Sequence, residues 1–361
     1  MGMRGPDHIA LSIDATQSRS PAAAGNRGQL DIAVIIVTYK SAELAVESLR
    51  SVDGERHTAD LIRIRAIVVD NASGDLPAIA EAVEKYHWSS WVTLVSAPKN
   101  GGFSYGNNVG IERAYADGTP DYVYLLNPDA QVRRGAIGAL VRFLEAHTTV
   151  GIAGSSFENL DGSEWPTSFR FPSLLSEVEQ GLRFSLTTLL LQRWVVARNM
   201  TRTDQPVDWI SGASMMIRSD VFAAVGGFDE NYFLYFEETD FCRRSRQAGF
   251  ATWYVPESRV MHIGGHSTEV TGTRNELKRL PTYWFESRRR YFAVSFGIGH
   301  AMAIDLLAIL AYSLGLLKRS ILRQRRSAVP HFVGDLVRNS VLWPRNRNLP
   351  AARCNIDDVR Y

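Results

Sequence analysis

The sequence predicts an α/β fold with a mostly parallel, open sheet flanked by helices. Apolar, β-branched runs such as Asp31–Thr38 (DIAVIIVT) and Ile62–Asp70 (IRIRAIVVD) are typical of strands buried on both faces. Segments with helical spacing separate these runs. Repeated alternation of strand and helix indicates parallel strands joined by crossover helices. Ligands of such sheets bind beyond the carboxyl ends of the strands, so we expect the site there.

The first 153 residues show the clearest alternation. Strands are expected at residues 31–38, 62–70, 91–96, 121–126 and 150–153, and helices at residues 42–52, 76–87, 111–116 and 134–147. The helix at 111–116 follows the Gly- and Asn-rich stretch Lys99–Gly110 (KNGGFSYGNNVG), whose glycines allow the backbone to approach a ligand closely. Polar residues end three strands, at Thr38-Tyr39, Asp70-Asn71 and Asn127-Pro128-Asp129. We interpret this half as a nucleotide-type binding surface.

The pattern becomes less regular beyond Gly154. Residues 157–202 mix aromatic residues and proline with a Leu-rich run at 182–191. A strand is expected at Trp209–Ile217, followed by a short helix that Ser219 caps and that stops at Gly226-Gly227. Another strand is expected at Phe250–Val255.

An acidic and aromatic stretch lies between these two strands, from Phe228 to Arg243 (FDENYFLYFEETDFCR). Solvated charge runs lack aromatic residues. Carboxylates held against apolar rings lose hydration, which raises the pKa towards the range that is useful for proton transfer. The alternative is an amphipathic helix with an aromatic inner face and an acidic outer face.

Composition separates the body of the chain from its C-terminal part. Of 361 residues, 45% are hydrophobic and 22% are charged, as is ordinary for a globular protein. The net charge of +2 combines +10 in residues 274–361 with −8 in residues 1–273. The basic charge flanks apolar residues instead of forming a basic face, so nucleic-acid binding is not expected. The chain has two cysteines, Cys242 and Cys354, which fits a reducing compartment.

The apolar segment Tyr291–Leu317 is long enough to span a bilayer, but it contains His300 and Asp305. Basic residues flank it, at 288–290 before it and at 318–326 after it. We favour a helix that lies at the membrane interface between these flanks, and a buried core helix is the alternative. Residues 1–30 have no apolar core long enough for a signal peptide and are expected to form a flexible leader.

Seven motifs in order resemble the family 2 glycosyltransferases, and within them the rhamnosyltransferase-like group. They are VIIVTYKS, VVDNASGD, KNGGFSYGNNVGI, YLLNPDA, WISGASMMIR, GGFDENYFLYFEETDFCRR and MHIGGHS. The resemblance implies a GT-A fold over residues 31–267, with a nucleotide-binding half (31–153) and an acceptor half (154–267). A helical, basic and apolar C-terminal region (268–361) would follow. Single motifs are less informative: Asn127-Pro128-Asp129 alone is a turn signal, and a lone His262 fits a structural role.

The resemblance also implies roles for residues in these motifs. Nucleotide-sugar binding is implied for Thr38, Tyr39, Asp70 (as the partner of a pyrimidine), Asn71, Asn100, Gly102, Asn108 and Asn127. Metal binding, of Mg²⁺ or Mn²⁺, is implied for Asp129 and His262. The acceptor side is implied for Trp209, Gly212 and Ala213. The catalytic base is implied at Glu238, with Glu237 and Asp240 as further candidates. Two positions depart from the family pattern, because Asn127 replaces an acid and Glu238 replaces an aspartate.

By this resemblance, the protein is an inverting glycosyltransferase that uses a nucleotide-diphosphate sugar, such as dTDP-L-rhamnose. Its acceptor would be a glycan or a polyprenyl-diphosphate-linked sugar at the inner face of the plasma membrane, and residues 274–361 would contact that membrane. The two departures motivate the alternative, a non-catalytic nucleotide-sugar-binding protein.

Overall fold

The computed structural model describes residues 29–57, 61–159, 161–198, 200–262, 278–322 and 329–354. The expected leader therefore lies almost entirely outside the described residues. The same holds for the end of the MHIGGHS motif and for the basic residues at 323–326. Those expectations stay predictions.

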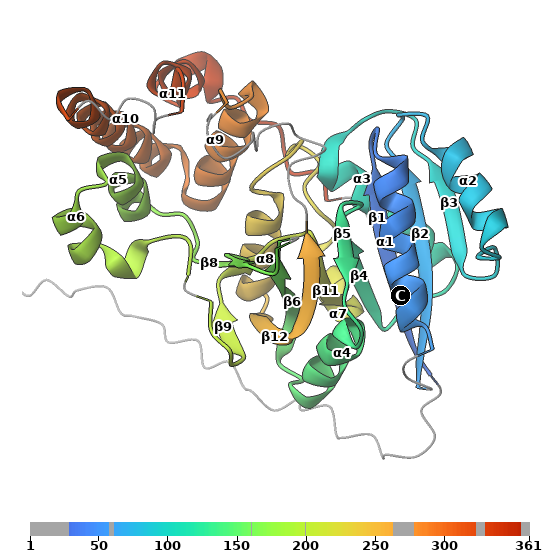
Figure 1. The fold of residues 1–361 in the computed structure, drawn as a ribbon. Coiled ribbons are helices and arrows are strands. Elements are labelled where there is room, and N and C mark those ends of the chain that lie inside the picture. Colours follow the sequence, from blue (N-terminus) through green and yellow to red (C-terminus); the bar gives the residue numbers. More distant parts are fainter. Residues whose placement is uncertain are drawn as a thin grey trace, which may run out of the picture.

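A single large sheet forms the centre of the fold, as expected (Figure 1). Its main strands have the order β3-β2-β1-β4-β11-β6-β12-β5. Their bounds are β1 Leu30–Thr38, β2 Ile62–Asp70, β3 Val92–Ser96, β4 Tyr122–Leu126, β5 Ala130–Val132, β6 Val150–Glu158, β11 Ser214–Arg218 and β12 Ala251–His262. The first four strands in this order are mutually parallel, and β12 is parallel to β6. Strand β11 is antiparallel to both β4 and β6, and β5 is antiparallel to β12.

Helices cover both faces of this sheet. Helices α1 (Ala42–Glu55), α2 (Leu76–Lys85) and α4 (Ala136–Ala146) share one apolar core with it. Helices α3 (Gly102–Ala116), α7 (Ser219–Val225) and α8 (Glu237–Gln247) share the core on the other face. Burial on both faces explains why the strand sequences are almost continuously apolar.

Three local expectations were wrong. Helix α3 begins at Gly102, so most of the Gly- and Asn-rich stretch is helical and is not a loop. The strand expected at 209–217 is two strands, because β10 (Trp209–Ile210) pairs with β8 (Ser168–Phe169) in a separate small sheet before the chain turns into β11. Ser219 is the first residue of α7, and its hydroxyl donates to the carbonyl of Pro120, so it does not cap the helix.

Strand β12 is longer than expected and continues to His262. Proline has no N–H to donate to a neighbouring strand, and Pro256 directly follows the strand expected at Phe250–Val255. In the structure the pairing with β6 is irregular between Val255 and Arg259 and then resumes. The strand therefore passes Pro256 and carries His262 to the edge where β4 ends.

The C-terminal region consists of α9 (Thr282–Phe296), α10 (Ile298–Ile321) and α11 (Phe332–Asn339), which pack with α5 (Leu174–Leu182) and α6 (Ser185–Leu190). The apolar segment at 291–317 is not one helix, because Gly297 (φ +83°) separates α9 from α10. The arginines expected to form its first basic flank are not a solvated flank. Arg288 and Arg290 are 1% and 3% exposed, and both are paired with buried carboxylates.

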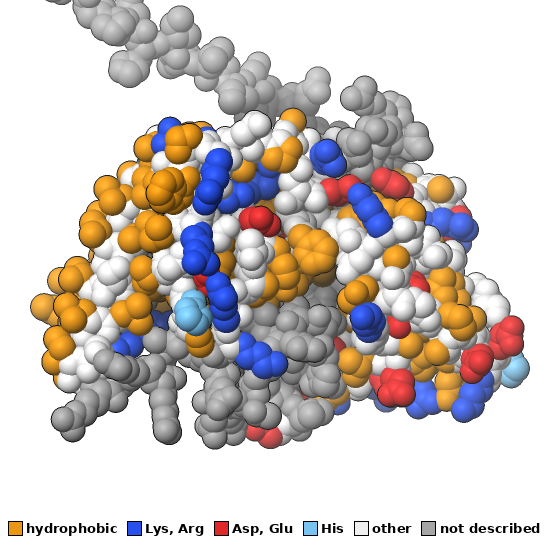
Figure 2. All heavy atoms as spheres, turned by 90° about the horizontal axis from the view of Figure 1, so that it is seen from above, with side chains coloured by type: hydrophobic (Ala, Val, Ile, Leu, Met, Phe, Trp, Pro, Cys, Tyr) orange, Lys and Arg blue, Asp and Glu red, His pale blue; other side chains and the backbone are white. Residues whose placement is uncertain are grey.

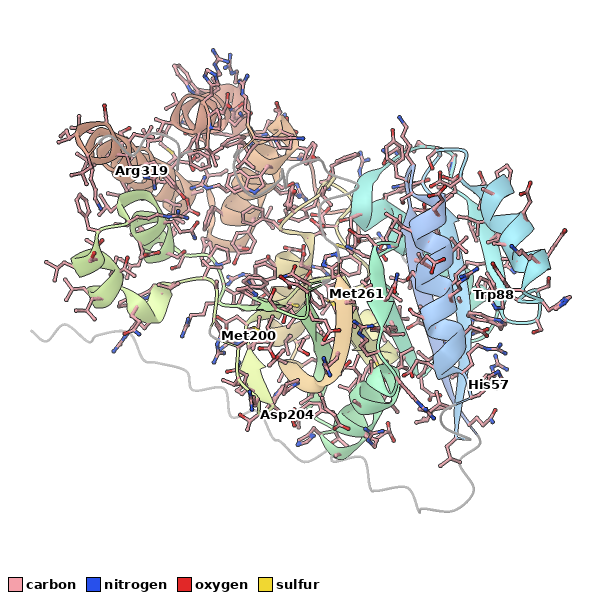
Figure 3. All side chains as sticks on the ribbon, in the orientation of Figure 1. His57, Trp88, Met200, Asp204, Met261 and Arg319 are labelled. Carbon is pink, nitrogen blue, oxygen red and sulfur yellow. The ribbon has the colours of Figure 1, made fainter. Side chains whose placement is uncertain are left out.

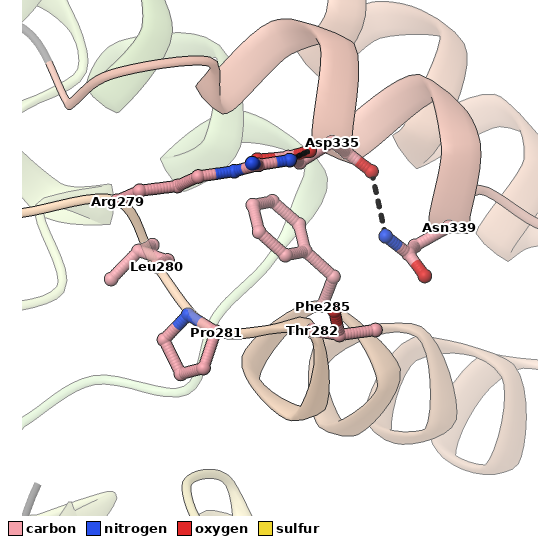
Figure 4. A pocket seen from close by; sticks show the side chains of 7 residues that line it. All are labelled: Arg279, Leu280, Pro281, Thr282, Phe285, Asp335 and Asn339. Atoms are coloured by element: carbon pink, nitrogen blue, oxygen red, sulfur yellow. Dashed lines mark hydrogen bonds and ion pairs between the residues drawn. The ribbon is translucent and has the colours of Figure 1, made fainter.

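A small cavity of about 340 Å³ lies at the start of α9, beside α11 (Figure 4). The guanidinium of Arg279 makes two hydrogen bonds to the Asp335 carboxylate along its wall, at 2.7 and 2.6 Å. The residues that line it do not include any predicted site residue. Several of the predicted site residues lie instead at the ends of the sheet strands.

Candidate active site

The predicted site residues gather at one edge of the sheet because of strand direction. Thr38 pairs with Asp70 at the carboxyl ends of β1 and β2, and Asn127 follows β4. Strand β11 is antiparallel to β4 and pairs Ser214 with Leu126, so the turn before β11 lies at the same edge. His262, at the end of β12, pairs with Ala130. In Figure 3 the label of Met261 marks this end of β12. It stands between the labels of Arg319, in the helical C-terminal region, and of Trp88, beside the first strands of the sheet.

The turn after β2 holds its own carboxylate. Asp70 accepts hydrogen bonds from the Ser73 hydroxyl and from the backbone of Ser73, Gly74 and Asp75. Burial opposes ionisation, but these bonds outweigh it and lower the pKa of Asp70. Asp75 in turn accepts the Thr38 hydroxyl at 2.5 Å. These side chains fix the shape of the edge, and the binding of a pyrimidine by Asp70 stays a prediction. Tyr39, next to Thr38, is half-buried.

Asparagine side chains connect the start of α3 to its neighbours. Asn71 donates to the carbonyl of Gly102 at 2.9 Å, and Asn100 accepts from the Gly102 backbone at 3.1 Å. Asn108 is fully buried, donates to the carbonyl of Phe228 at 2.8 Å and accepts from its N–H at 2.9 Å. Asn108 therefore joins α3 to the start of the acidic and aromatic stretch. This is a structural task that the sequence did not show.

Gly102 permits the close approach of α3 to residue Phe233. Its φ is +81°, and a Cβ added there would lie 1.9 Å from the Phe233 carbonyl oxygen. That oxygen accepts the Phe103 N–H at 2.8 Å. The nucleotide-binding role that the resemblance implies for Gly102 stays a prediction, and its conformation gives it a structural role as well, at the contact of α3 with Phe233.

We expect Gly102→Ala to lower the free energy of unfolding. The left-handed backbone costs a side chain about 1–2 kcal/mol, and displacing Phe233 adds about 1–3 kcal/mol. Gly118→Ala is the matched control, because Gly118 has φ +122° and no described atom lies within 4 Å of an added Cβ. Denaturant unfolding of both variants measures the difference. Equal losses would show that the contact with Phe233 is not tight.

The acidic and aromatic stretch is a loop followed by a helix, and so it differs from the alternative of a single amphipathic helix. Residues 228–236 form the loop, and α8 begins at Glu237. Tyr235 and Phe236 both have positive φ, at +71° and +68°. Such conformations are rare for aromatic residues and persist only where the surroundings impose them. They place Glu237 and Glu238 in the first turn of α8, where the helix dipole favours negative charge.

Glu237 and Glu238 form a buried carboxyl pair. Glu237 is 2% exposed, and Glu238 is half-buried. Burial, with the adjacent Glu238 carboxylate, raises the pKa of Glu237 well above the usual range for glutamate. Burial also raises the pKa of Glu238, although hydrogen bonds from its own backbone, from the Gly212 backbone and from Glu237 oppose that rise. These directions are those of a pair in which the Glu237 carboxyl donates a hydrogen bond to the Glu238 carboxylate. One oxygen of each carboxyl has no hydrogen-bond partner among the residues that the structure describes.

Asp240 is engaged in a different contact. Its carboxylate accepts Arg244 Nε at 2.8 Å, one turn along α8. Arg244 also donates to the carbonyls of Val225 and Gly227. The geometry thus gives Asp240 a structural partner, whereas one buried oxygen of Glu238 has no hydrogen-bond partner among the described residues.

The loop before α8 is anchored to the C-terminal region. Asp229 accepts two hydrogen bonds from Arg290, at 2.8 and 2.5 Å, and one from the Arg353 N–H at 3.0 Å. Burial opposes ionisation, but these bonds lower the pKa of Asp229. Ser287 donates to the carbonyl of Leu234 at 3.0 Å. The sequence offered no signal for this arrangement, because the arginine run reads as a basic flank.

The three residues implied on the acceptor side lie in or next to the turn between β10 and β11. Gly212 supplies the backbone contact to Glu238 and packs against Phe103, which an added Cβ would approach to 2.7 Å. The Ala213 carbonyl accepts the Asn127 N–H at 3.1 Å, which ties this turn to the end of β4. Trp209 stacks on Phe169 with ring centroids 4.2 Å apart and donates to the carbonyl of Arg170.

Asp129 and His262 meet across the edge of the sheet. The Oδ1 atom of Asp129 lies 3.2 Å from His262 Nε2, and both side chains are buried. Within the described parts of the chain, no three His, Cys, Asp or Glu side chains are grouped to hold a metal ion. Mg²⁺ usually binds one or two carboxylates and completes its coordination with water and substrate phosphates. The donor set therefore fits a divalent ion that is held partly by a bound diphosphate.

Comparisons with known proteins identify the family of this chain. The family model described as "Glycosyltransferase like family 2" matches residues 29–290. The N-acetylglucosaminyl-diphospho-decaprenol L-rhamnosyltransferase of Mycobacterium tuberculosis is 33% identical over 216 residues, which are 57% of this chain and 68% of that protein. Rhamnosyltransferase WbbL of Escherichia coli K12 is 27% identical over 196 residues, which are 53% of this chain and 70% of that protein.

Two solved structures share the fold. One is GalNAc-T7 with UDP, GalNAc and Mn²⁺, with a TM-score of 0.54 and 14% identity over 87% of this chain and 58% of the other. The second is the mannosyltransferase PcManGT from Pyrobaculum calidifontis with GDP-Man and Mn²⁺, with a TM-score of 0.50 and 15% identity over 86% of this chain and 79% of the other. These likenesses concern the fold alone, and this chain spans just over half of the first structure. The chain belongs to the glycosyltransferase-like family 2, and it is a glycosyltransferase with a GT-A fold.

Proposed function

We propose that the protein transfers a sugar with inversion from a nucleotide-diphosphate donor to a hydroxyl group of a cell-surface polysaccharide or a lipid-linked acceptor. The observation that carries this proposal is the buried Glu237–Glu238 pair, which faces the Gly212 turn at the carboxyl edge of the sheet. The donor that we propose is dTDP-L-rhamnose or another pyrimidine-nucleotide sugar. Similarity to proteins named as rhamnosyltransferases supports this choice.

Glu238 is the proposed base. Its pair with Glu237 holds one proton, and Glu237 is the more deeply buried member, so Glu237 keeps that proton and Glu238 remains ionised. Glu238 would accept the proton of the acceptor hydroxyl as that oxygen attacks the anomeric carbon from the face opposite the nucleotide. The Gly212 N–H and the hydrogen bond from Glu237 orient the Glu238 carboxylate for this transfer. Asp240, held by Arg244, is not needed as a base in this scheme.

Asp129 and His262 are the proposed ligands of a divalent metal, Mg²⁺ or Mn²⁺, with Asn127 beside them after β4. When bound, the metal would stabilise the negative charge that develops on the leaving diphosphate. The side chains around the turns at Thr38, Asp70 and Asn100 are proposed to line the nucleotide pocket. The proposed lipid-linked acceptor places the enzyme at the inner face of the plasma membrane, in contact through residues 274–361.

We expect Asp129→Ala to abolish the effect of Mn²⁺ on donor binding. Loss of a metal ligand should lower donor affinity in the presence of Mn²⁺ at least about 10-fold, because the diphosphate loses the ion that it shares with the protein. Calorimetric titration with dTDP-L-rhamnose and a panel of other nucleotide sugars, with and without Mn²⁺, measures this. Asp117→Ala, which removes a surface carboxylate paired with Arg113, is the control.

Two results would contradict these roles. Metal-independent donor binding that is equal in the wild type and Asp129→Ala would remove the metal site from the proposal. If none of the nucleotide sugars bound to the wild type, the nucleotide-pocket assignments would be wrong.

A further inference from the structure

Helix α10 exposes an apolar stripe to solvent. The exposed leucines and isoleucine recur every three or four residues and so lie on one side of the helix. They are Leu306 (51%), Leu310 (51%), Leu314 (54%), Leu317 (58%) and Ile321 (72%). The opposite side of α10, with Ala301, Ile304, Ala308, Ala311 and Gly315, is buried in the protein. The helix is therefore apolar on both sides, and only one side is used by the fold.

Helix α6 exposes a second group of large apolar side chains, from the Leu-rich run to which the sequence gave no role. Leu186, Leu189 and Leu190 are 66%, 67% and 68% exposed, and Phe184 just before them is 37% exposed. None of the residues of α6 is buried. A six-residue helix without a buried side gains little from packing, so these leucines are not explained by the core.

The two groups are close neighbours. Lys318, near the end of α10, donates to the carbonyl of Arg183 at 2.8 Å, and its ammonium lies 4.1 Å from the centre of the Phe184 ring. Gly315 packs against the carbonyl of Gly181 in α5, which an added Cβ would approach to 2.0 Å. Helices α5, α6 and α10 thus form one side of the molecule (Figure 1), and hydrophobic side chains gather on the same side in Figure 2. We call the exposed side chains of α6 and α10 the apolar face.

Cations are placed where the two parts of the apolar face meet. Arg183 is exposed beside Phe184, Arg193 is exposed after α6, and Lys318 and Arg319 end the stripe of α10. Long basic side chains can bury their methylenes against apolar surface and keep their charge at the level of lipid headgroups. This combination of an exposed apolar face with cations at its border matches an anionic lipid surface.

The polar contacts on the buried side of α10 restrict how this helix can contact a membrane. Among the described helices, α10 is the one that is long and apolar enough to cross a bilayer. However, Asp305 on its buried side is 2% exposed and is bound to Arg288 of α9 at 2.6 Å. It also accepts the N–H of Val341 at 2.8 Å. Lipid on all sides of α10 would require these contacts to break inside the hydrocarbon, where polar groups are costly. A bilayer can cover the apolar face without disturbing them.

We propose that α6 and α10 together dock the protein onto an anionic bilayer, with α10 lying in the plane of the interface. This deepens the proposed function, because its lipid-linked acceptor would reside in the same bilayer. Helix α9, which Gly297 separates from α10, holds the loop before the carboxyl pair through the Arg290–Asp229 ion pair. The docking helix is therefore connected through α9 to the loop that precedes the carboxyl pair. The proposed function includes membrane contact through residues 274–361 only. This inference adds α6 as a second part of the docking surface.

The test is flotation of the full chain with vesicles of phosphatidylglycerol and phosphatidylcholine. We expect the α6 variant Leu186→Ser/Leu189→Ser/Leu190→Ser and the α10 variant Leu310→Ser/Leu314→Ser/Leu317→Ser each to lower the vesicle-bound fraction at least about 10-fold. Lys318→Gln/Arg319→Gln should weaken binding to these vesicles and have little effect with phosphatidylcholine alone. Leu61→Ser is the control, because Leu61 is 70% exposed and lies directly before β2.

Donor binding in solution separates this inference from the proposed function. Each variant should bind the donor like the wild type, which shows that the site is folded. A wild type that does not float, or an α6 variant that floats as well as the wild type, would overturn the proposal. Light scattering gives a further contradicting outcome. If it shows a dimer that the leucine substitutions dissociate, and flotation is unchanged, a second copy of the chain covers the apolar face and the proposal is overturned. A protein that floats but transfers no sugar would leave docking intact and reject the proposed reaction.

Discussion

Glu238→Gln is expected to lower the turnover number for sugar transfer by about 10²–10⁴-fold, the usual contribution of a general base. Glutamine has the same shape but cannot accept the proton of the acceptor hydroxyl. Donor affinity should be nearly unchanged, because the proposed nucleotide and metal ligands lie on other elements. Glu257→Gln is the matched control, since Glu257 is a surface residue paired with Arg142 and both side chains are more than 60% exposed. Single-turnover assays with saturating donor measure the chemical step.

The pH dependence gives a second signature of the same pair. Burial raises the pKa of Glu237 and of Glu238 above the ordinary value, and the base must be ionised to work. The ratio kcat/KM should therefore rise with pH through an apparent pKa above the usual range for glutamate, and that value belongs to the pair. Activity should be lost as the pH falls through it. The acid limb should disappear from the residual activity of Glu238→Gln.

Glu237→Gln distinguishes the two glutamates. The amide can still donate a hydrogen bond to Glu238, so transfer should persist in this variant and should keep an acid limb, because Glu238 still has to be ionised. If instead Glu237→Gln were inactive and Glu238→Gln active, the base would be Glu237. If both variants transferred sugar at the rate of the wild type, neither carboxyl would be the base. A wild type that binds the donor but turns over with no acceptor would favour the non-catalytic alternative.

The parallel strands of the first 126 residues were predictable because their chemistry is local. Asp31–Thr38 and Ile62–Asp70 are apolar at nearly every position, and strands buried on two faces require this. The same reasoning placed Thr38 and Asp70 at one edge of the sheet, where they pair in the structure. The burial of Glu237, and the raised pKa of both glutamates, also followed from their aromatic neighbours.

The parts that were missed depend on contacts between distant segments. Asn108 joins α3 to Phe228 across 120 positions, and neither neighbourhood shows which residue the other supplies. The start of α3 at Gly102 depends on a close contact with Phe233, whereas glycine and asparagine alone favour a loop. Asp70 accepts four hydrogen bonds from residues 73–75 in the turn that follows it, and the sequence motif does not show these bonds. The largest error concerned the arginine run, because three consecutive cations look solvated until their partners are known.

Arg288→Met is expected to lower the free energy of unfolding by about 3–5 kcal/mol, the typical cost of removing one partner from a buried ion pair. Arg288 is 1% exposed and donates to Glu177 Oε2 at 3.1 and 2.7 Å and to Asp305 Oδ1 at 2.6 Å. Methionine can fill the space but leaves two carboxylates in the interior without their cation. Arg142→Met removes an exposed pair of the same type and should cost about 0–1 kcal/mol. Denaturant unfolding measures both.

A combined variant separates loss of charge balance from loss of packing. Arg288→Met/Glu177→Gln/Asp305→Asn removes all three charges and should regain part of the stability lost by Arg288→Met, because uncompensated buried charge is the main penalty. No recovery would mean that Arg288 acts mainly through the packing of its side chain against Phe292, whose ring centre lies 4.8 Å from the guanidinium carbon. The cluster joins α5, α9 and α10, so its loss should also loosen the support that α9 gives to the loop before Glu237. The Arg288→Met variant should therefore lose turnover at temperatures below its unfolding midpoint, while Arg142→Met should not.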